Sequence, residues 1–315
     1  MPDNTKASKI SLHIPSLSVV VVTVYESSHL VNCLDALERQ NGAPDMETIV
    51  VCHENILDIS SLRERFPSVQ FHRLLGRQTQ DMLRAYGVSR ARGKIVAVTV
   101  DHCTPEENWC AHIMKAHQGS NAAVGGAIEK GIQPDTLVNW AVHLYDYSNY
   151  GYYLNPTSNG PARDLSDCNV SYKREALAAV SNLWKKAFNV SLLNRTLKAR
   201  GETLWLSPDI LVYQNRNIDF DRAARIACRR GRAFASARLA SLTRNQRLVY
   251  AALSPLLPLL LMRRFVLNII RKKSHLGNAL RALPCIIVFA ILWSWGEFRG
   301  YFTGQLNFTV AASEE

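Results

Sequence analysis

The sequence lacks the paired cysteines that mark zinc ribbons and disulfide frameworks. Its seven cysteines are widely scattered and include no Cys-x-x-Cys pair. This spacing indicates neither a zinc site nor a disulfide framework, and it favours a reducing compartment. Residues 1–15 contain no apolar run, so no secretory signal is expected.

Glycine-rich phosphate motifs are also missing. Neither GxGxxG nor GxxxxGK[S/T] occurs in the chain, which excludes the dinucleotide fingerprint and the P-loop as the means of holding a phosphate. If the protein binds a diphosphate, it needs another device, such as a bound metal ion.

Acidic residues are absent from residues 222–281, which carry fourteen Lys or Arg, whereas the rest of the 315-residue chain holds 23 basic against 26 acidic residues. Such a basic segment points to nucleic acid or to an anionic membrane surface. Apolar stretches follow the arginines at once, and no recognised nucleic-acid motif is present, so we expect a membrane lipid surface as partner and no nucleic acid.

The N-terminal half alternates strand-like and helix-like patterns. Runs of apolar or β-branched residues at 18–24, 48–52, 69–72 and 95–100 are separated by segments with apolar residues at helical spacing. This alternation predicts an α/β fold with a mainly parallel sheet flanked by helices, whose strand carboxyl ends form one ligand face.

Asp101 and His102 are the first residues past the run 95–100, at the place where open α/β sheets hold ligands. A carboxylate beside an imidazole can hold a divalent cation and, through it, a diphosphate. The alternative is that Asp101 caps a turn and His102 lies on the surface.

Five segments of residues 17–240 carry a recognisable pattern: SVVVVTVYESSHLVNCLDALERQ, METIVVCHEN, LRAYGVSRARGKIVAVTVDHCTPEENW, AVGGAIEKG and DCNVSYKREAL. In their order and spacing these segments resemble family 2 glycosyltransferases, which have the GT-A fold. A C-terminal WSWGEFRGYFTG is similar to the tail of bacterial membrane-associated members. The resemblance implies an inverting, hexosyltransferase-like transfer from a nucleotide-diphospho-sugar, assisted by Mn²⁺ or Mg²⁺, in polysaccharide biosynthesis.

The resemblance assigns the family's site residues to individual positions of this sequence. The family's DxD tripeptide falls on Val100-Asp101-His102, which makes Asp101 and His102 the implied metal ligands. The implied nucleotide-sugar contacts are Thr23, Tyr25, Glu26, His53, Glu54, Arg84, Asp101, Asn169, Arg229 and Arg232.

The family's general base has no counterpart here, because its position falls on Val190. A general base typically contributes about 10²- to 10⁴-fold to the rate. The expected catalytic carboxylates are therefore Asp167 and Asp164, or else the acceptor is already ionised, as a polyprenyl phosphate is. The aromatic residues of segment 140–153 are expected either to stack on the acceptor or to pack in the core.

The C-terminal part contains two apolar stretches of about 15 residues, 248–262 and 282–295. As helices they would reach only about 22 Å, short of the ~30 Å hydrocarbon core. We expect interfacial or re-entrant helices on the cytoplasmic side of the cell membrane, and spanning helices are the alternative. The expected division is a tail (1–16), a glycosyltransferase domain (17–240), a membrane-associated helical segment (241–304) and a second tail (305–315).

Two functions are compatible with this sequence. The first is an inverting glycosyltransferase that moves a sugar to a lipid-linked or polysaccharide acceptor. The second is a membrane protein that binds a nucleotide sugar, has lost catalysis and serves as a partner or regulator, which the replacement at Val190 favours.

Overall fold

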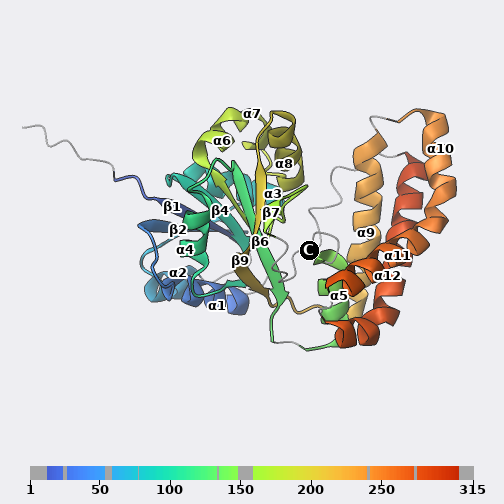
Figure 1. The fold of residues 1–315 in the computed structure, drawn as a ribbon, viewed down its shortest axis with the longest axis horizontal. Helices are drawn as coiled ribbons and strands as arrows, with labels where there is room; N and C mark the ends of the chain where they lie inside the picture. The colour runs from blue at the N-terminus through green and yellow to red at the C-terminus, as the bar shows by residue number, and fades with distance from the viewer. Residues whose placement is uncertain are drawn as a thin grey trace, which may run out of the picture.

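The computed structural model describes residues 13–23, 27–53, 59–76, 78–132, 135–147, 159–239, 242–272 and 275–304. Figure 1 shows a body built around a twisted sheet and, beside it, a separate layer of helices. The strands are β1 (Leu17–Thr23), β2 (Met46–His53), β3 (Val69–Leu74), β4 (Ile95–Val100), β5 (Cys103–Pro105), β6 (Ala123–Lys130), β7 (Gly160–Pro161), β8 (Asn169–Lys173) and β9 (Leu204–Gln214).

The helices of the sheet body are α1 (Ser27–Glu38), α2 (Ile59–Arg65), α3 (Gln80–Arg90), α4 (Trp109–Ala116), α6 (Arg174–Ala179), α7 (Ser181–Trp184) and α8 (Val190–Ala199). The helices of the second layer are α5 (Leu137–Tyr147), α9 (Phe220–Arg238), α10 (Arg244–Leu253), α11 (Leu257–Lys272) and α12 (Leu276–Thr303), with a short 3₁₀ turn between α10 and α11.

The sheet is mixed and mostly parallel at its N-terminal end, with the order β3-β2-β1-β4-β8-β6-β9-β5. Strands β3, β2, β1 and β4 run parallel, and β8 then pairs antiparallel with β4 and with β6. The predicted α/β class and the four predicted N-terminal strands are confirmed. The carboxyl ends of β1 and β4 lie at one edge, where the turn to His102 begins.

Alternating side chains of β1 build a core on each face of the sheet. Val19 and Val21 pack with Leu30 and Leu34 of α1 on one face, while Val20 and Val22 pack with α3 on the other. Helix α3 comes very close to the sheet at Gly87, where an added Cβ would collide with the side chain of Val20. This close packing fixes the position of Arg84, one turn earlier in α3.

Two elements of the sheet body are irregular. Val180 ends α6 and separates it from α7. Strand β9 runs through Pro208, and its pairing with β6 shifts between Gly126 and Ala127. Since proline cannot donate to a strand ladder, this irregularity is where a sheet tolerates it.

The second layer is built on α12, which packs along α9 and α5. Helices α9 and α12 approach each other so closely that an added Cβ would collide with the opposite backbone. At Gly231 of α9 it would meet Trp293, and at Gly296 of α12 it would meet Cys228. The apolar residues of α5, α9, α11 and α12 form a core of their own, separate from the two cores of the sheet.

The apolar helices are longer than the two 15-residue stretches suggested. The segments Arg244–Ile270, 27 residues, and Leu276–Thr303, 28 residues, are long and apolar enough to cross a membrane. In the most apolar 18-residue stretch of each segment, only 17% and 28% of the residues are buried in the protein, which is compatible with membrane association. The expectation of short helices was wrong because it counted only uninterrupted apolar residues, and these helices continue past Arg263, Arg264 and Gly296.

Candidate active site

A pocket of about 380 Å³ lies between the carboxyl edge of the sheet and the second helical layer. Its sheet side is formed by Arg84 of α3, by His102 beyond β4 and by the loop 165–168 before β8. Its opposite side is formed by α5, α9, α11 and α12. The pocket therefore includes side chains of both layers.

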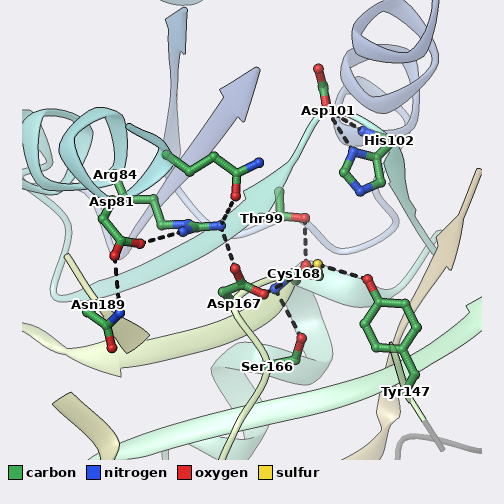
Figure 2. A network of polar contacts seen from close by, with 11 residues as sticks. Asp81, Arg84, Thr99, Asp101, His102, Tyr147, Ser166, Asp167, Cys168 and Asn189 are labelled. Atoms are coloured by element: carbon green, nitrogen blue, oxygen red, sulfur yellow. Dashed lines mark hydrogen bonds and ion pairs between the residues drawn. The ribbon is translucent and has the colours of Figure 1, made fainter. Parts of the chain in front are cut away.

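Arg84 is a buried cation in the wall of this pocket. It is 2% exposed, and its guanidinium donates to Asp167 Oδ2 at 2.6 Å, to Asp81 Oδ1 at 2.9 Å and to Gln80 Oε1 at 3.1 Å. Figure 2 shows Arg84 between Asp81 and Asp167. Burial raises the pKa of Asp167, but the charges of Arg84 and Arg230 outweigh burial and hold it below its ordinary value. Asp167 is therefore ionised at neutral pH.

Asp81 is a second pocket carboxylate, and the sequence reasoning missed it. Its Oδ2 accepts a hydrogen bond of 3.1 Å from Asn189, the residue that caps α8 directly before Val190. Burial raises the pKa of Asp81 despite the nearby Arg84. Its place in the first turn of α3 gave no signal in the sequence, because an acidic residue there also fits an ordinary helix start.

His102 and Asp101 lie side by side, but only His102 lines the pocket. The Asp101 carboxylate is fully buried; Oδ2 accepts from Thr23, and Oδ1 lies 3.0 Å from His102 Nδ1. Burial lowers the pKa of His102, yet hydrogen bonds to Asp101 and Cys168 outweigh it and raise the pKa to about 9. Asp101 thus orients the imidazole from behind.

The opposite wall combines charge with apolar surface. Arg230 of α9 lies 2.8 Å from Asp146 Oδ1, and Arg216 lies 3.9 Å from Oδ2 of the same carboxylate. Leu261 of α11 and Trp293 of α12 line the pocket beside them. Of the arginines in α9, Arg230 lines the pocket. Arg229 and Arg232, which the sequence resemblance implied as nucleotide-sugar contacts, are not among the lining residues.

Other predicted site residues have roles inside the protein. Asp164 accepts from Ser191 and Asn194 of α8 and does not line the pocket. The buried Asn169 bonds Trp109 through Oδ1 and the carbonyls of Ala127 and Ile210 through Nδ2.

The remaining predictions concern the strand ends. His53 is half-buried at the end of β2 and lies outside the pocket lining. Tyr25, Glu26 and Glu54 lie outside the described residues. Of segment 140–153, Tyr145 and Tyr147 line the pocket, whereas Trp140 packs against His143 and His275.

The donor atoms near His102 do not suit Mn²⁺ or Mg²⁺ well, since these cations favour oxygen ligands. The Asp101 oxygens already accept from Thr23 and His102. The groups gathered at His102 are instead the thiols of Cys103 and Cys168. A hard divalent cation would find one imidazole nitrogen here and no free carboxylate oxygen of Asp101.

Residues 18–181, just over half of the chain, match the family model described as "Glycosyl transferase family 2". The chain belongs to glycosyl transferase family 2. No curated protein matches it in sequence. Among solved structures, the mannosyltransferase PcManGT from Pyrobaculum calidifontis, in complex with GDP-Man and Mn²⁺, matches with a TM-score of 0.57 at 15% sequence identity. The match covers 93% of this chain and 89% of that one, so the structural similarity is not confined to the sheet body.

The sequence resemblance places the family's base at Val190, an apolar residue. Val190 is 5% exposed and lines the pocket between Asn189 and Ser191. Of the described pocket residues, the carboxylates are Asp81, Asp146 and Asp167.

Proposed function

We propose that the protein transfers a sugar, with inversion, from a nucleotide-diphospho-sugar to a lipid-linked acceptor at the cytoplasmic face of a membrane. The observation that carries this proposal is the composition of the pocket. One wall belongs to the sheet that carries the family's donor-site positions, and the other includes Leu261 and Trp293 of the two long apolar helices. A donor on the sheet side and a lipid-borne acceptor on the helix side would meet between them.

Charge in the pocket supports a phosphorylated ligand. Arg84, His102, Arg216 and Arg230 all line it, and guanidinium groups bind phosphate oxygens in a bidentate way. Arg84 is paired with Asp81 and Asp167 on the sheet side. We assign an incoming phosphate to Arg216 and Arg230, which flank Asp146.

Asp167 is the residue we place nearest the transferred sugar. Its pairing with Arg84 keeps it ionised at the centre of the pocket, where it can accept hydrogen bonds from sugar hydroxyls or the proton of an attacking hydroxyl. An acceptor phosphate needs no base, and this fits the apolar Val190.

A second candidate function is nucleotide-sugar binding without catalysis. Val190 in the pocket wall favours it, because the family's base position offers no carboxylate there.

One assay separates these functions. Membranes from expressing cells are incubated with UDP-, GDP- or dTDP-sugars, with Mg²⁺ or with Mn²⁺, and nucleotide release is followed in parallel with donor binding. A transferase releases nucleotide from one donor class as a lipid-extractable sugar product forms. Binding of one donor, with no release across all donors and both metals, selects the second function.

A further inference from the structure

Three side chains with a preference for thiophilic metals meet beside the pocket, and two of them, His102 and Cys168, line it. The ligand atoms of His102, Cys103 and Cys168 all lie within 4.8 Å of one another. The three residues are only 6%, 0% and 6% exposed. They come together because β4 and β8 pair antiparallel with Thr99 opposite Asn169, which brings the start of β8 beside the end of β4.

The surroundings hold these groups in place. Asp101 Oδ1 lies 3.0 Å from His102 Nδ1, and His102 shares a hydrogen bond with Cys168 on its other side. Figure 2 shows the imidazole between Asp101 and the loop of Cys168. A histidine that binds a metal through one ring nitrogen almost always donates the N–H of the other to a carboxylate, a backbone carbonyl or water. This hydrogen bond fixes the tautomer and raises the basicity of the ligand.

Cys168 is held by two further contacts. The Tyr147 hydroxyl lies 3.3 Å from its Sγ, and Thr99 Oγ1 donates to its carbonyl at 2.9 Å.

The donor set decides which metals fit. Two sulfur atoms and one imidazole nitrogen select Zn²⁺ and similar soft cations, whereas Mn²⁺ and Mg²⁺ favour oxygen. Zn–S bonds of about 2.3 Å and Zn–N bonds of about 2.0 Å place tetrahedral ligand atoms roughly 3.5 Å apart. Since the three atoms lie within 4.8 Å of one another, they need to close by roughly 1.3 Å at most.

We propose that His102, Cys103 and Cys168 bind one thiophilic divalent cation, Zn²⁺ in preference to Mn²⁺ or Mg²⁺, with its fourth position open to the pocket. His102 and Cys168 line the pocket, so the open position faces it, as in zinc sites with three protein ligands that serve catalysis. On binding, the thiols of Cys103 and Cys168 give up their protons to solvent, and His102 binds through the Nε2 lone pair, so a proton on that nitrogen is also released. That this position faces the donor diphosphate rests on the proposed function; the site itself does not.

Metal binding can be measured without any enzymatic turnover. The full chain, purified in detergent with a non-thiol reductant and stripped of metal, is titrated with Zn²⁺ and with Co²⁺. We expect one tightly bound Zn²⁺ per chain, and a Co²⁺ complex with sulfur-to-metal charge-transfer absorption and the intense visible bands of tetrahedral Co²⁺. An excess of Mn²⁺ or Mg²⁺ should not displace either ion.

Variants identify the ligands. Cys103→Ser and Cys168→Ser should each weaken Zn²⁺ binding at least tenfold and abolish the charge-transfer band. The matched control is Cys110→Ser, because Cys110 is another fully buried thiol, packed against Met46 and outside the cluster. It should bind Zn²⁺ as the wild type does.

X-ray absorption at the zinc edge of the wild-type protein needs no variant and keeps the test independent of folding defects. Two sulfur neighbours of zinc support the site. A shell of oxygen and nitrogen alone, a Cys103–Cys168 disulfide with no metal bound under reducing conditions, or unchanged binding in both serine variants would overturn it. Failure of sugar transfer with zinc bound through sulfur would refute only the proposed function.

Discussion

Arg84 and Asp167 form an ion pair of 2.6 Å on the sheet side of the pocket, although 83 residues separate them in the chain. Arg84 comes from α3, which Gly87 holds tightly against β1 and β2, and Asp167 comes from the loop before β8. The pair therefore links the two parts of the sheet body at the place where we expect the donor sugar.

Replacing Asp167 with Asn should reduce sugar transfer by about 10²- to 10⁴-fold, the range for a group that accepts or directs a proton. Donor binding should change much less, because the change keeps size and polarity. Rates of nucleotide release and calorimetric donor affinities check this prediction. Asp35→Asn is the matched control, since it breaks another Arg–Asp pair, with Arg65 at 2.7 Å, far from the pocket lining. Equal rates in both variants would contradict the role of Asp167.

Trp293 should contribute to recognition of the acceptor. Trp293→Ala removes apolar wall from the pocket, so we expect KM for a lipid-linked acceptor to rise about tenfold, with donor affinity unchanged. The control is Trp295→Ala on the same helix, which is 53% exposed and outside the pocket lining. Steady-state kinetics in detergent measure both. A loss of donor affinity in Trp293→Ala would place the donor, not the acceptor, against α12.

Glu47 should make stability fall in acid. Burial raises its pKa, but hydrogen bonds from Ser18, Arg92 and Gln70 outweigh burial, so the folded-state pKa lies below the ordinary value of 4.5. A carboxyl with a depressed pKa contributes stability that is present above pH 4.5 and is lost as the pH falls through its folded-state pKa.

Thermal unfolding at several pH values tests the contribution of Glu47. Glu47→Gln should be less stable than the wild type at pH 7 by about 1–3 kcal/mol, the range for loss of a hydrogen-bonded buried charge. The difference should shrink below pH 4. A constant difference from pH 7 to pH 3 would contradict the account.

The contact of α9 with α12 should tolerate no larger side chain at Gly296. Gly296→Leu places atoms where the Cys228 carbonyl lies, and forced overpacking typically costs about 1–3 kcal/mol. We expect a lower midpoint of thermal unfolding and weaker acceptor binding, because α9 carries Arg230 and α12 carries Trp293. Gly277→Ala, at a glycine with open space around it, should leave both unchanged.

The sheet and its helices were largely predictable because local patterns decide them. Apolar alternation in 18–24 and 95–100, together with the Thr79 cap of α3, already specifies strands and helices from neighbouring residues. The continuity of β9 through Pro208 was not predictable, since it depends on pairing with β6. The lengths of the segment Arg244–Ile270 and of α12 were underestimated because charged residues inside them do not end a helix.

The site was predictable only in part. The spacing that identified Asp101, His102, Arg84 and Asp167 comes from ordered segments of sequence, and the structure brings His102, Arg84 and Asp167 together in one pocket. Which face of α9 turns toward the pocket depends on its packing against α12, so Arg230 could not be distinguished from Arg229 and Arg232. The cysteine spacing could not indicate the proposed zinc site, because Cys103 and Cys168 are 65 positions apart in the chain. They meet only through the pairing of β4 with β8.

The most direct test of the central claim is incorporation of labelled sugar into lipid extracts by membranes that contain either the wild-type protein or Asp167→Asn. The account predicts that one nucleotide-diphospho-sugar labels a lipid-extractable product with the wild type, and that Asp167→Asn reduces this label at least a hundredfold at equal protein level. Donor binding by the wild type with no labelled product from any UDP-, GDP- or dTDP-sugar would contradict it.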